Sequence, residues 1–360
     1  MAEIVAYEDE SEDRSIEEIF EAFLLRYATV REMKNKHVEL ATFIRRFFIL
    51  HQFWIEGELT YWKLARGWLI YTVSNTEIIV TICHMVRVTI LTKEFHLGDY
   101  TTNLTLIIAL PLGFYLFQTL YLQQKGWQAL VLEMGNFEVY EKPPDLEVRA
   151  AMSDVLIKIT LLIIFLPVPF LAYYIITANC PDPEDYACGI MFPAYFPGCM
   201  GRFRPICGLV HLATAYSIAY IGYLSSCFYS QLSEFIVIYL QYFQTMLKKI
   251  PTIENWDERW AHMNMTLKYH QRILELYETY YFLVKDAFLI HIFGTPVVLA
   301  VLIYTFLTDF RIQNVAHSLL WVFSLSYVCF FGQRMVDEVK FFSILTKIYF
   351  FTLFLLIMRF

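Results

Sequence analysis

The sequence predicts an all-α, polytopic transmembrane helical bundle of six to seven spans, with a cytosolic N-terminus and cytosolic extensions of its helices. Three observations support this prediction: the composition, a series of long uncharged segments, and the distribution of basic residues. Hydrophobic residues make up 58% of the chain and charged residues only 18%, whereas soluble domains contain about 25% charged residues. A chain of this composition is suited to contact with lipid.

The N-terminal region, residues 1–62, is predicted to be a cytosolic tail followed by interfacial helices. Acidic residues dominate the first twenty positions, which lack the basic start and short apolar core of a secretory signal peptide. From Ile19 to Trp62, apolar and charged residues interleave at helical spacing, which is typical of helices at a membrane surface.

The transmembrane domain is predicted to cover residues 63–340. Its spans are expected at about residues 68–91, 100–122, 159–178, 208–233, 287–308 and 315–335. Five of them are centred on segments without Lys, Arg, Asp or Glu, and about 20 helical residues cross a hydrocarbon core of about 30 Å. The first span carries Glu77, His84 and Arg87 on one helical face, which we expect to face the bundle because charges facing lipid are costly.

Two cytosolic helices are expected between the fourth and fifth spans. Apolar periodicity continues past Ser233 to Ile250, and Pro251 is the first residue that breaks it. A second amphipathic helix, at 254–285, leads into the fifth span and carries a broad apolar stripe. Prolines within the spans are expected to kink their helices, at Pro111, Pro167, Pro169 and Pro296.

Basic residues gather on the side of the membrane that alternating spans share with the N-terminus. Lys and Arg are frequent before the first span, after the second and after the fourth. The loops on the opposite side contain only four basic residues, Lys93, Arg202, Arg204 and Arg311. Because cytosolic loops carry the excess of Lys and Arg, the N-terminus is predicted to be cytosolic.

Cysteines support the same orientation. Four of the seven lie in the loop between the third and fourth spans, which this orientation places outside the cell: Cys180, Cys188, Cys199 and Cys207. Disulfides persist on the oxidising side of a membrane, so we expect at least one here. Four cysteines allow three pairings, which stay open, and free thiols are the alternative.

No catalytic signature is present in the sequence. The chain contains no G-x-S-x-G, H-E-x-x-H, Walker A or G-x-G-x-x-G motif. His262 and His270 lack a third metal ligand nearby in the sequence. We therefore expect a protein that is not an enzyme, without catalytic residues, metal or cofactor, and without a nucleic-acid partner.

The outer halves of the spans contain aromatic, hydroxyl and aliphatic residues that suit a pocket for a small apolar molecule. Each residue alone is more often used for helix packing or lipid contact, so the hypothesis concerns the group. Its members are Ile108, Leu112, Phe170, Tyr173, Tyr174, His211, Tyr216, Tyr220, Tyr304 and Trp321.

Two local signatures give the chain a family resemblance. One is Tyr269-His270-Gln271-Arg272-Ile273-Leu274, before the fifth span. The other is Phe330-Phe331-Gly332-Gln333-Arg334 with Asp337-Glu338, at the end of the sixth span. Together with the inverted topology and the long loop between spans three and four, these motifs resemble the insect odorant receptor family over about residues 60–340.

The resemblance implies a ligand-gated, non-selective cation channel that assembles as a heterotetramer with an odorant coreceptor. Such a subunit lies in the plasma membrane of olfactory sensory neurons and binds a small apolar odorant in an outer-half pocket, while packed cytosolic helices join the subunits. The family coreceptor has a much longer insertion between spans four and five. This chain therefore resembles the odorant-tuned subunit and not the coreceptor.

The C-terminal residues 341–360 depart from the family pattern. They form a short, atypical hydrophobic segment in place of a cytosolic helix followed by a seventh, pore-lining span. Three alternatives therefore accompany the odorant-receptor hypothesis: a gustatory receptor of the same superfamily, a non-conducting truncated receptor isoform, and a membrane transporter.

Overall fold

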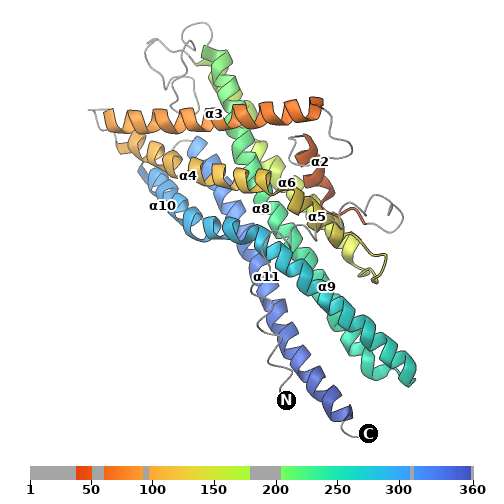
Figure 1. Cartoon of the computed structure of the whole chain (residues 1–360). Helices are drawn as coiled ribbons and strands as arrows, with labels where there is room; N and C mark the ends of the chain where they lie inside the picture. Colours follow the sequence, from red (N-terminus) through yellow and green to blue (C-terminus); the bar gives the residue numbers. More distant parts are fainter. Residues whose placement is uncertain (1–37, 51–60, 92–96, 179–203, 309–311, 358–360) are drawn as a thin grey trace, which may run out of the picture.

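The computed structural model describes residues 38–50, 61–91, 97–178, 204–308 and 312–357, and these residues are almost entirely helical (Figure 1). The all-α prediction is therefore confirmed for this part of the chain. In chain order, the helices are α2 (Thr42–Leu50), α3 (Tyr61–Leu91), α4 (Leu97–Leu122), α5 (Gln124–Met134), α6 (Leu146–Phe165), α7 (Val168–Thr177), α8 (Arg204–Lys249), η4 (Ile250–Thr252), α9 (Trp256–Leu289), η5 (Ile290–Gly294), α10 (Thr295–Thr308) and α11 (Ile312–Ile357).

The long helix α8 is the centre of the arrangement. It contacts α11, α9, α4, α7 and α6, and α9 lies beside its second half (Figure 1). Helices α4 and α10 pack side by side, and α3 contacts α4. In Figure 1, α11 runs along α8 and then continues away from the bundle.

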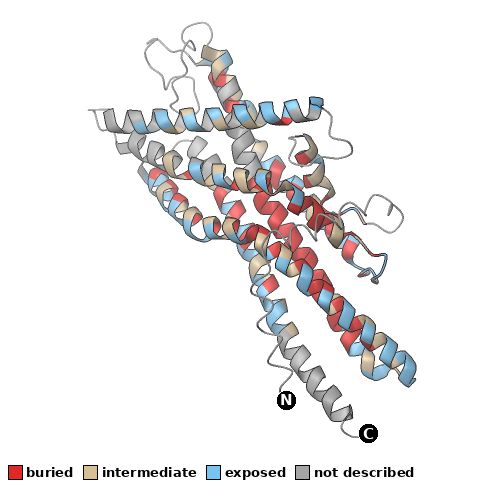
Figure 2. Ribbon diagram, viewed as in Figure 1, coloured by how far each residue is buried: buried red, intermediate tan, exposed pale blue. Residues whose placement is uncertain are grey.

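The hydrophobic core surrounds the middle of α8. Every residue from Tyr223 to Leu240 is buried, as the red segment in Figure 2 shows. A helix buried on all sides must satisfy its polar side chains internally. Ser225 and Ser226 do so by donating to the Gly222 carbonyl oxygen at 2.7 and 3.0 Å, and Ser233 donates to the Ser230 carbonyl oxygen at 2.7 Å.

The two helices predicted between the fourth and fifth spans are present. Helix α8 continues without a break to Lys249, and the 3-10 turn η4 contains Pro251. The side chain of Asn255 then caps α9 by accepting a hydrogen bond from the Asp257 amide at 2.9 Å. Only part of the apolar stripe of α9 packs against the rest of the chain, since Ile273 is buried whereas Leu274 is exposed.

The predicted proline positions have different structural outcomes. Near Pro167 the helix of the predicted third span is interrupted, because α6 ends at Phe165 and α7 begins at Val168. Pro111 lies inside α4, which continues from Leu97 to Leu122. Pro296 lies in the first turn of α10, directly after the π-helical turn η5.

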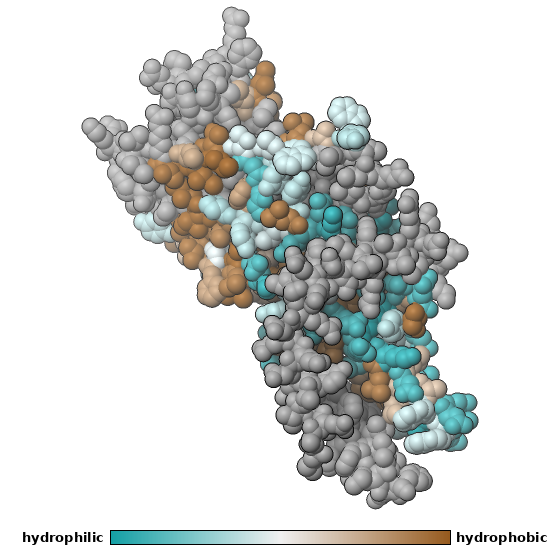
Figure 3. Space-filling view, in the orientation of Figure 1, coloured by the Kyte–Doolittle hydropathy of each residue, from teal (hydrophilic) through white to brown (hydrophobic). Residues whose placement is uncertain are grey.

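The surface carries extensive apolar area. Two helical stretches in the described residues are long and apolar enough to cross a bilayer, Leu146–Thr177 and Trp256–Leu307. Only 24% and 28% of their most apolar segments are buried inside the protein. Figure 3 shows hydrophobic side chains gathered over the part of the molecule that contains α4 and α10. The predicted spans at 68–91, 208–233 and 315–335 each include side chains that lie outside the described set.

Several sequence predictions lie partly or wholly outside the described residues. The N-terminal tail and the loop with Cys180, Cys188 and Cys199 are among them. Cys207 lies in the first turn of α8, and the free cysteines among the described residues are Cys83, Cys227 and Cys329. The predicted boundary at residue 340 falls inside α11, which continues from Ile312 to Ile357.

Candidate functional site

Three of the predicted pocket residues share one apolar cluster. Ile108 and Leu112, on α4, and Trp321, on α11, pack with Ala109, Val298, Leu299 and Leu302. We call this group the α4–α10–α11 cluster. Its buried members include Val298 and Leu302 on α10, and Trp321 is only 7% exposed. Helix α4 and the consecutive helices α10 and α11 thus contribute to a cluster without charged groups, and side chains of this kind line the sites that bind small apolar molecules.

The other predicted pocket residues lie elsewhere. Phe170, Tyr173 and Tyr174 are on α7 with 71%, 70% and 55% of their surface exposed. The inner face of α7 is instead formed by Leu171 and Ile175, which pack with Leu212 of α8. These three aromatic residues therefore point away from the described core.

Tyr304 is also outside the α4–α10–α11 cluster. It lies on α10 and is 47% exposed, whereas the cluster residues of this helix are Val298, Leu299 and Leu302. The positions of His211, Tyr216 and Tyr220 belong to α8, but their side chains lie outside the described set. The full pocket list thus stays a prediction.

A polar junction joins α8 to the π-helical turn next to this cluster. His291, 1% exposed, lies in η5, with its Nε2 2.9 Å from Ser226 Oγ and its Nδ1 3.3 Å from Thr295 Oγ1. Since the single Ser226 hydroxyl proton is directed to the Gly222 carbonyl, Nε2–H is the donor to Ser226. The Nε2 contact joins η5 to α8, and the Nδ1 contact joins η5 to the first residue of α10.

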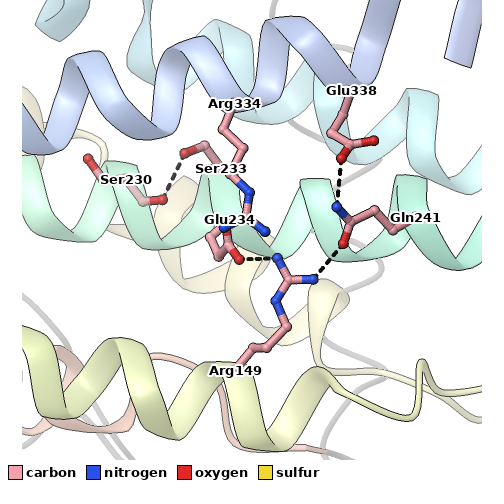
Figure 4. A network of polar contacts seen from close by, with 7 residues as sticks. All are labelled: Arg149, Ser230, Ser233, Glu234, Gln241, Arg334 and Glu338. Atoms are coloured by element: carbon pink, nitrogen blue, oxygen red, sulfur yellow. Dashed lines mark hydrogen bonds and ion pairs between the residues drawn. The ribbon is translucent and has the colours of Figure 1, made fainter. Parts of the chain in front are cut away.

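A second polar group links three helices at the predicted cytosolic side (Figure 4). Glu234 on α8 forms ion pairs with Arg149 of α6 and with Arg334 of α11, where Arg334 Nη1 lies 2.9 Å from Glu234 Oε2. The Glu234 side chain is only 6% exposed, so its charge depends on these two partners. Glu234 and Arg334 lie at the cytosolic ends of the predicted fourth and sixth spans, and Arg149 lies in the part of α6 that precedes the third.

Two glutamines of α8 extend this network to the second motif. Arg149 Nη1 donates to Gln241 Oε1 at 2.6 Å, and Gln241 Nε2 donates to Glu338 Oε1 at 2.6 Å. Gln244 donates to the other Glu338 oxygen at 3.1 Å. Two residues of the motif at the end of the sixth span, Arg334 and Glu338, thus bind α11 to α8.

The first motif contributes a buried cation, Arg272, which is 4% exposed. Its Nη2 donates to the carbonyl oxygens of Glu133, at 2.8 Å, and of Asn136. Its guanidinium carbon lies 4.4 Å from the ring centre of Tyr140 and 5.1 Å from that of Phe137. Because carbonyls at a helix C-terminus and aromatic faces both attract cations, these groups compensate the buried charge at the end of α5.

Sequence reasoning had missed most partners in these groups. Glu234 could have been noticed as the first charge after the uncharged run that ends at Ser233. Arg149 carries no distinguishing pattern, and neither does the Ser226–His291 pair. The partners of these residues lie on other helices, so no local spacing in the sequence indicates the contacts.

Comparisons with known proteins give a match in fold only. No protein-family model matches the sequence, and no curated protein matches it. The fold is similar to a solved structure of the insect olfactory receptor OR5 from Machilis hrabei, with a TM-score of 0.51 and 12% sequence identity. The similarity covers 89% of this chain and 82% of that chain. The polytopic helical fold class predicted from the sequence is thereby confirmed.

Proposed function

We propose that this protein is an odorant-tuned receptor subunit of a ligand-gated, non-selective cation channel, which acts with a coreceptor in the plasma membrane of olfactory sensory neurons. The observation that carries the proposal is the shared fold with an insect olfactory receptor over 89% of the chain. The two motifs that resemble this family add weight, because both take part in helix-to-helix contacts through Arg272 and Arg334.

The α4–α10–α11 cluster is the candidate odorant site. Its described members are aliphatic or aromatic, with Ile108, Leu112 and Trp321 among them. A site of this kind binds through apolar contact and shape, which suits a small volatile molecule without charge. Phe170, Tyr173, Tyr174, His211, Tyr216, Tyr220 and Tyr304 complete the proposed set from the sequence.

The connection between α8 and α9 supports the odorant-tuned role. Helix α8 ends at Lys249, the short turn η4 follows, and α9 begins at Trp256. A long cytosolic insertion at this point would be expected for the coreceptor. The proposal also includes an extracellular disulfide between two of Cys180, Cys188, Cys199 and Cys207.

Electrophysiology tests the proposal directly. The chain is expressed in oocytes with an odorant coreceptor, and a broad panel of volatile apolar molecules is applied under voltage clamp. We expect inward cation currents that are absent when the coreceptor is expressed alone. Silence to the whole panel, with surface delivery verified by an extracellular epitope tag, would contradict the proposal.

Three further measurements on the same cells separate the alternatives. Currents evoked by sugars and not by odorants would identify a gustatory receptor. Radiotracer uptake without current would identify a transporter. Odorant binding without any current, with both subunits at the surface, would identify a non-conducting receptor isoform.

A further inference from the structure

Gly294 lies against a residue of the candidate odorant site. A Cβ atom built at this position would be 2.6 Å from Leu112 Cδ1, 2.9 Å from Cδ2 and 3.3 Å from Cγ. Carbon atoms that are not bonded approach one another to about 3.5 to 4.0 Å. Any side chain at position 294 therefore requires a movement of Leu112 or of the backbone that carries Gly294.

The backbone of Gly294 is held from several directions. It is the last residue of the π-helical turn η5, which hydrogen bonds fix to α8 through His291 and Ser226. Pro296 follows at the start of α10, and its ring fixes the backbone φ angle at that position. The Leu112 side chain is the less constrained partner, because the clashing atoms include its two terminal methyl groups.

Leu112 packs within the α4–α10–α11 cluster, together with Ala109, Val298 and Trp321. A methyl group added at Gly294 would displace Leu112 toward the other members of the cluster. The change would reduce the space that this cluster can offer to a ligand. Because the backbone stays in place and a terminal side chain moves, the effect would fall on the shape of the site more than on the fold.

We propose that Gly294 is a specificity-determining position: the absence of a side chain there sets the place of Leu112, and thereby the largest odorant that the cluster admits. This inference rests on the proposed function, since it assumes that the cluster binds the odorant. It assigns to η5, which the sequence analysis did not single out, a direct role in ligand selection.

The experiment compares Gly294→Ala with Gly113→Ala. Both variants exchange glycine for alanine, but a Cβ at Gly113, on α4, would meet nothing within 4 Å. Each variant is expressed with the coreceptor and tested with a homologous series of straight-chain aliphatic alcohols and methyl esters. We expect Gly294→Ala to raise the half-maximal concentration of the longer members about tenfold or more relative to the shorter ones. Gly113→Ala should leave the ranking unchanged.

A double substitution tests the contact itself. In the Leu112→Ala background the clashing methyl groups are gone, so a further Gly294→Ala change should alter the odorant ranking little. Thermal unfolding of all four proteins, purified in detergent, provides a readout that requires no odorant. The coupling between the two positions should appear there as non-additive shifts in unfolding temperature.

The outcomes separate this inference from the proposed function. A wild-type protein that reaches the surface but responds to no odorant would refute the proposed function. A wild-type protein that responds normally while Gly294→Ala keeps the same ranking would overturn this inference alone. An equal change in ranking for Gly113→Ala and Gly294→Ala would also overturn it, because the effect would then not depend on the Leu112 contact.

Discussion

Arg334 Nη1 lies 2.9 Å from Glu234 Oε2 and ties α11 to the most buried part of α8. On its other oxygen, Glu234 pairs with Arg149 of α6, so one buried carboxylate holds two cations from two helices. Glu234 and Arg334 lie at the predicted cytosolic ends of their spans, and Arg149 lies in the part of α6 that precedes the third span. The two ion pairs of Glu234 therefore fix the position of α11 along its axis relative to α6 and α8, as well as the contact among the three helices.

Replacing Glu234 with Gln should strongly destabilise the protein. The change leaves Arg149 and Arg334 without a counter-charge, and breaking a buried pair from one side costs up to about 3 to 5 kcal/mol. The two arginine side chains are 21% and 36% exposed, so water lowers this cost, and we expect about 2 kcal/mol. The difference in stability between this variant and the wild-type protein is measured by thermal unfolding in detergent, with size-exclusion chromatography as the readout.

The matched control for that substitution is Glu147→Gln. Glu147 pairs with Lys142 at 2.8 Å, but both side chains are well exposed, at 61% and 40%. Surface pairs of this kind contribute about 0 to 1 kcal/mol. Equal losses at Glu234 and Glu147 would show that the buried network has no special contribution.

Arg272 should not tolerate lysine. A lysine at this position keeps the positive charge but has no flat guanidinium to lie against Tyr140 while it donates to the carbonyls at the end of α5. We expect Arg272→Lys and Arg272→Met each to lower the free energy of unfolding by about 2 kcal/mol. Lys268→Met, at an exposed position of α9, is the control. Wild-type stability in Arg272→Lys would mean that the charge alone is sufficient.

His270 should make stability depend on pH. It lies outside the predicted spans, with its ring 5.5 Å from Phe243 and 5.2 Å from Phe342, and burial lowers its pKa below the ordinary 6.5. The unfolded chain therefore binds a proton more readily, and stability should fall as pH decreases below about 6.5. His270→Phe keeps the ring contacts and removes this contribution. Unfolding temperatures between pH 8 and pH 5 for both proteins give the comparison, and identical slopes would contradict the prediction.

Trp321 and Tyr173 should differ in their effect on odorant responses. Trp321 is a buried member of the α4–α10–α11 cluster, whereas Tyr173 is 70% exposed on α7. We expect Trp321→Ala to shift odorant preference at least tenfold, and Tyr173→Ala to shift it less, with surface delivery retained in both. Dose–response curves with the coreceptor supply the test. A larger shift at Tyr173 would move the candidate site from the cluster to the face of α7.

Some of the candidate site could be predicted from residue type and depth, and some could not. Ile108, Leu112 and Trp321 were selected because they are apolar and lie in predicted spans, and they meet in one cluster. Phe170, Tyr173 and Tyr174 satisfied the same criteria but are exposed on α7. Composition and depth place a residue in a layer of the bundle, whereas the rotation of each helix decides which residues face inward.

The sequence by itself determined the all-α class, the continuous helix α8 and the turn at Pro251, because periodicity and proline are local properties. Only the tertiary structure decided that Glu234 holds Arg149 and Arg334, that Arg272 lies at the end of α5, and that Gly294 meets Leu112. These contacts join residues from different helices. They depend on how far each helix is rotated and shifted against its neighbours, which is a property of the packed bundle and not of any one segment.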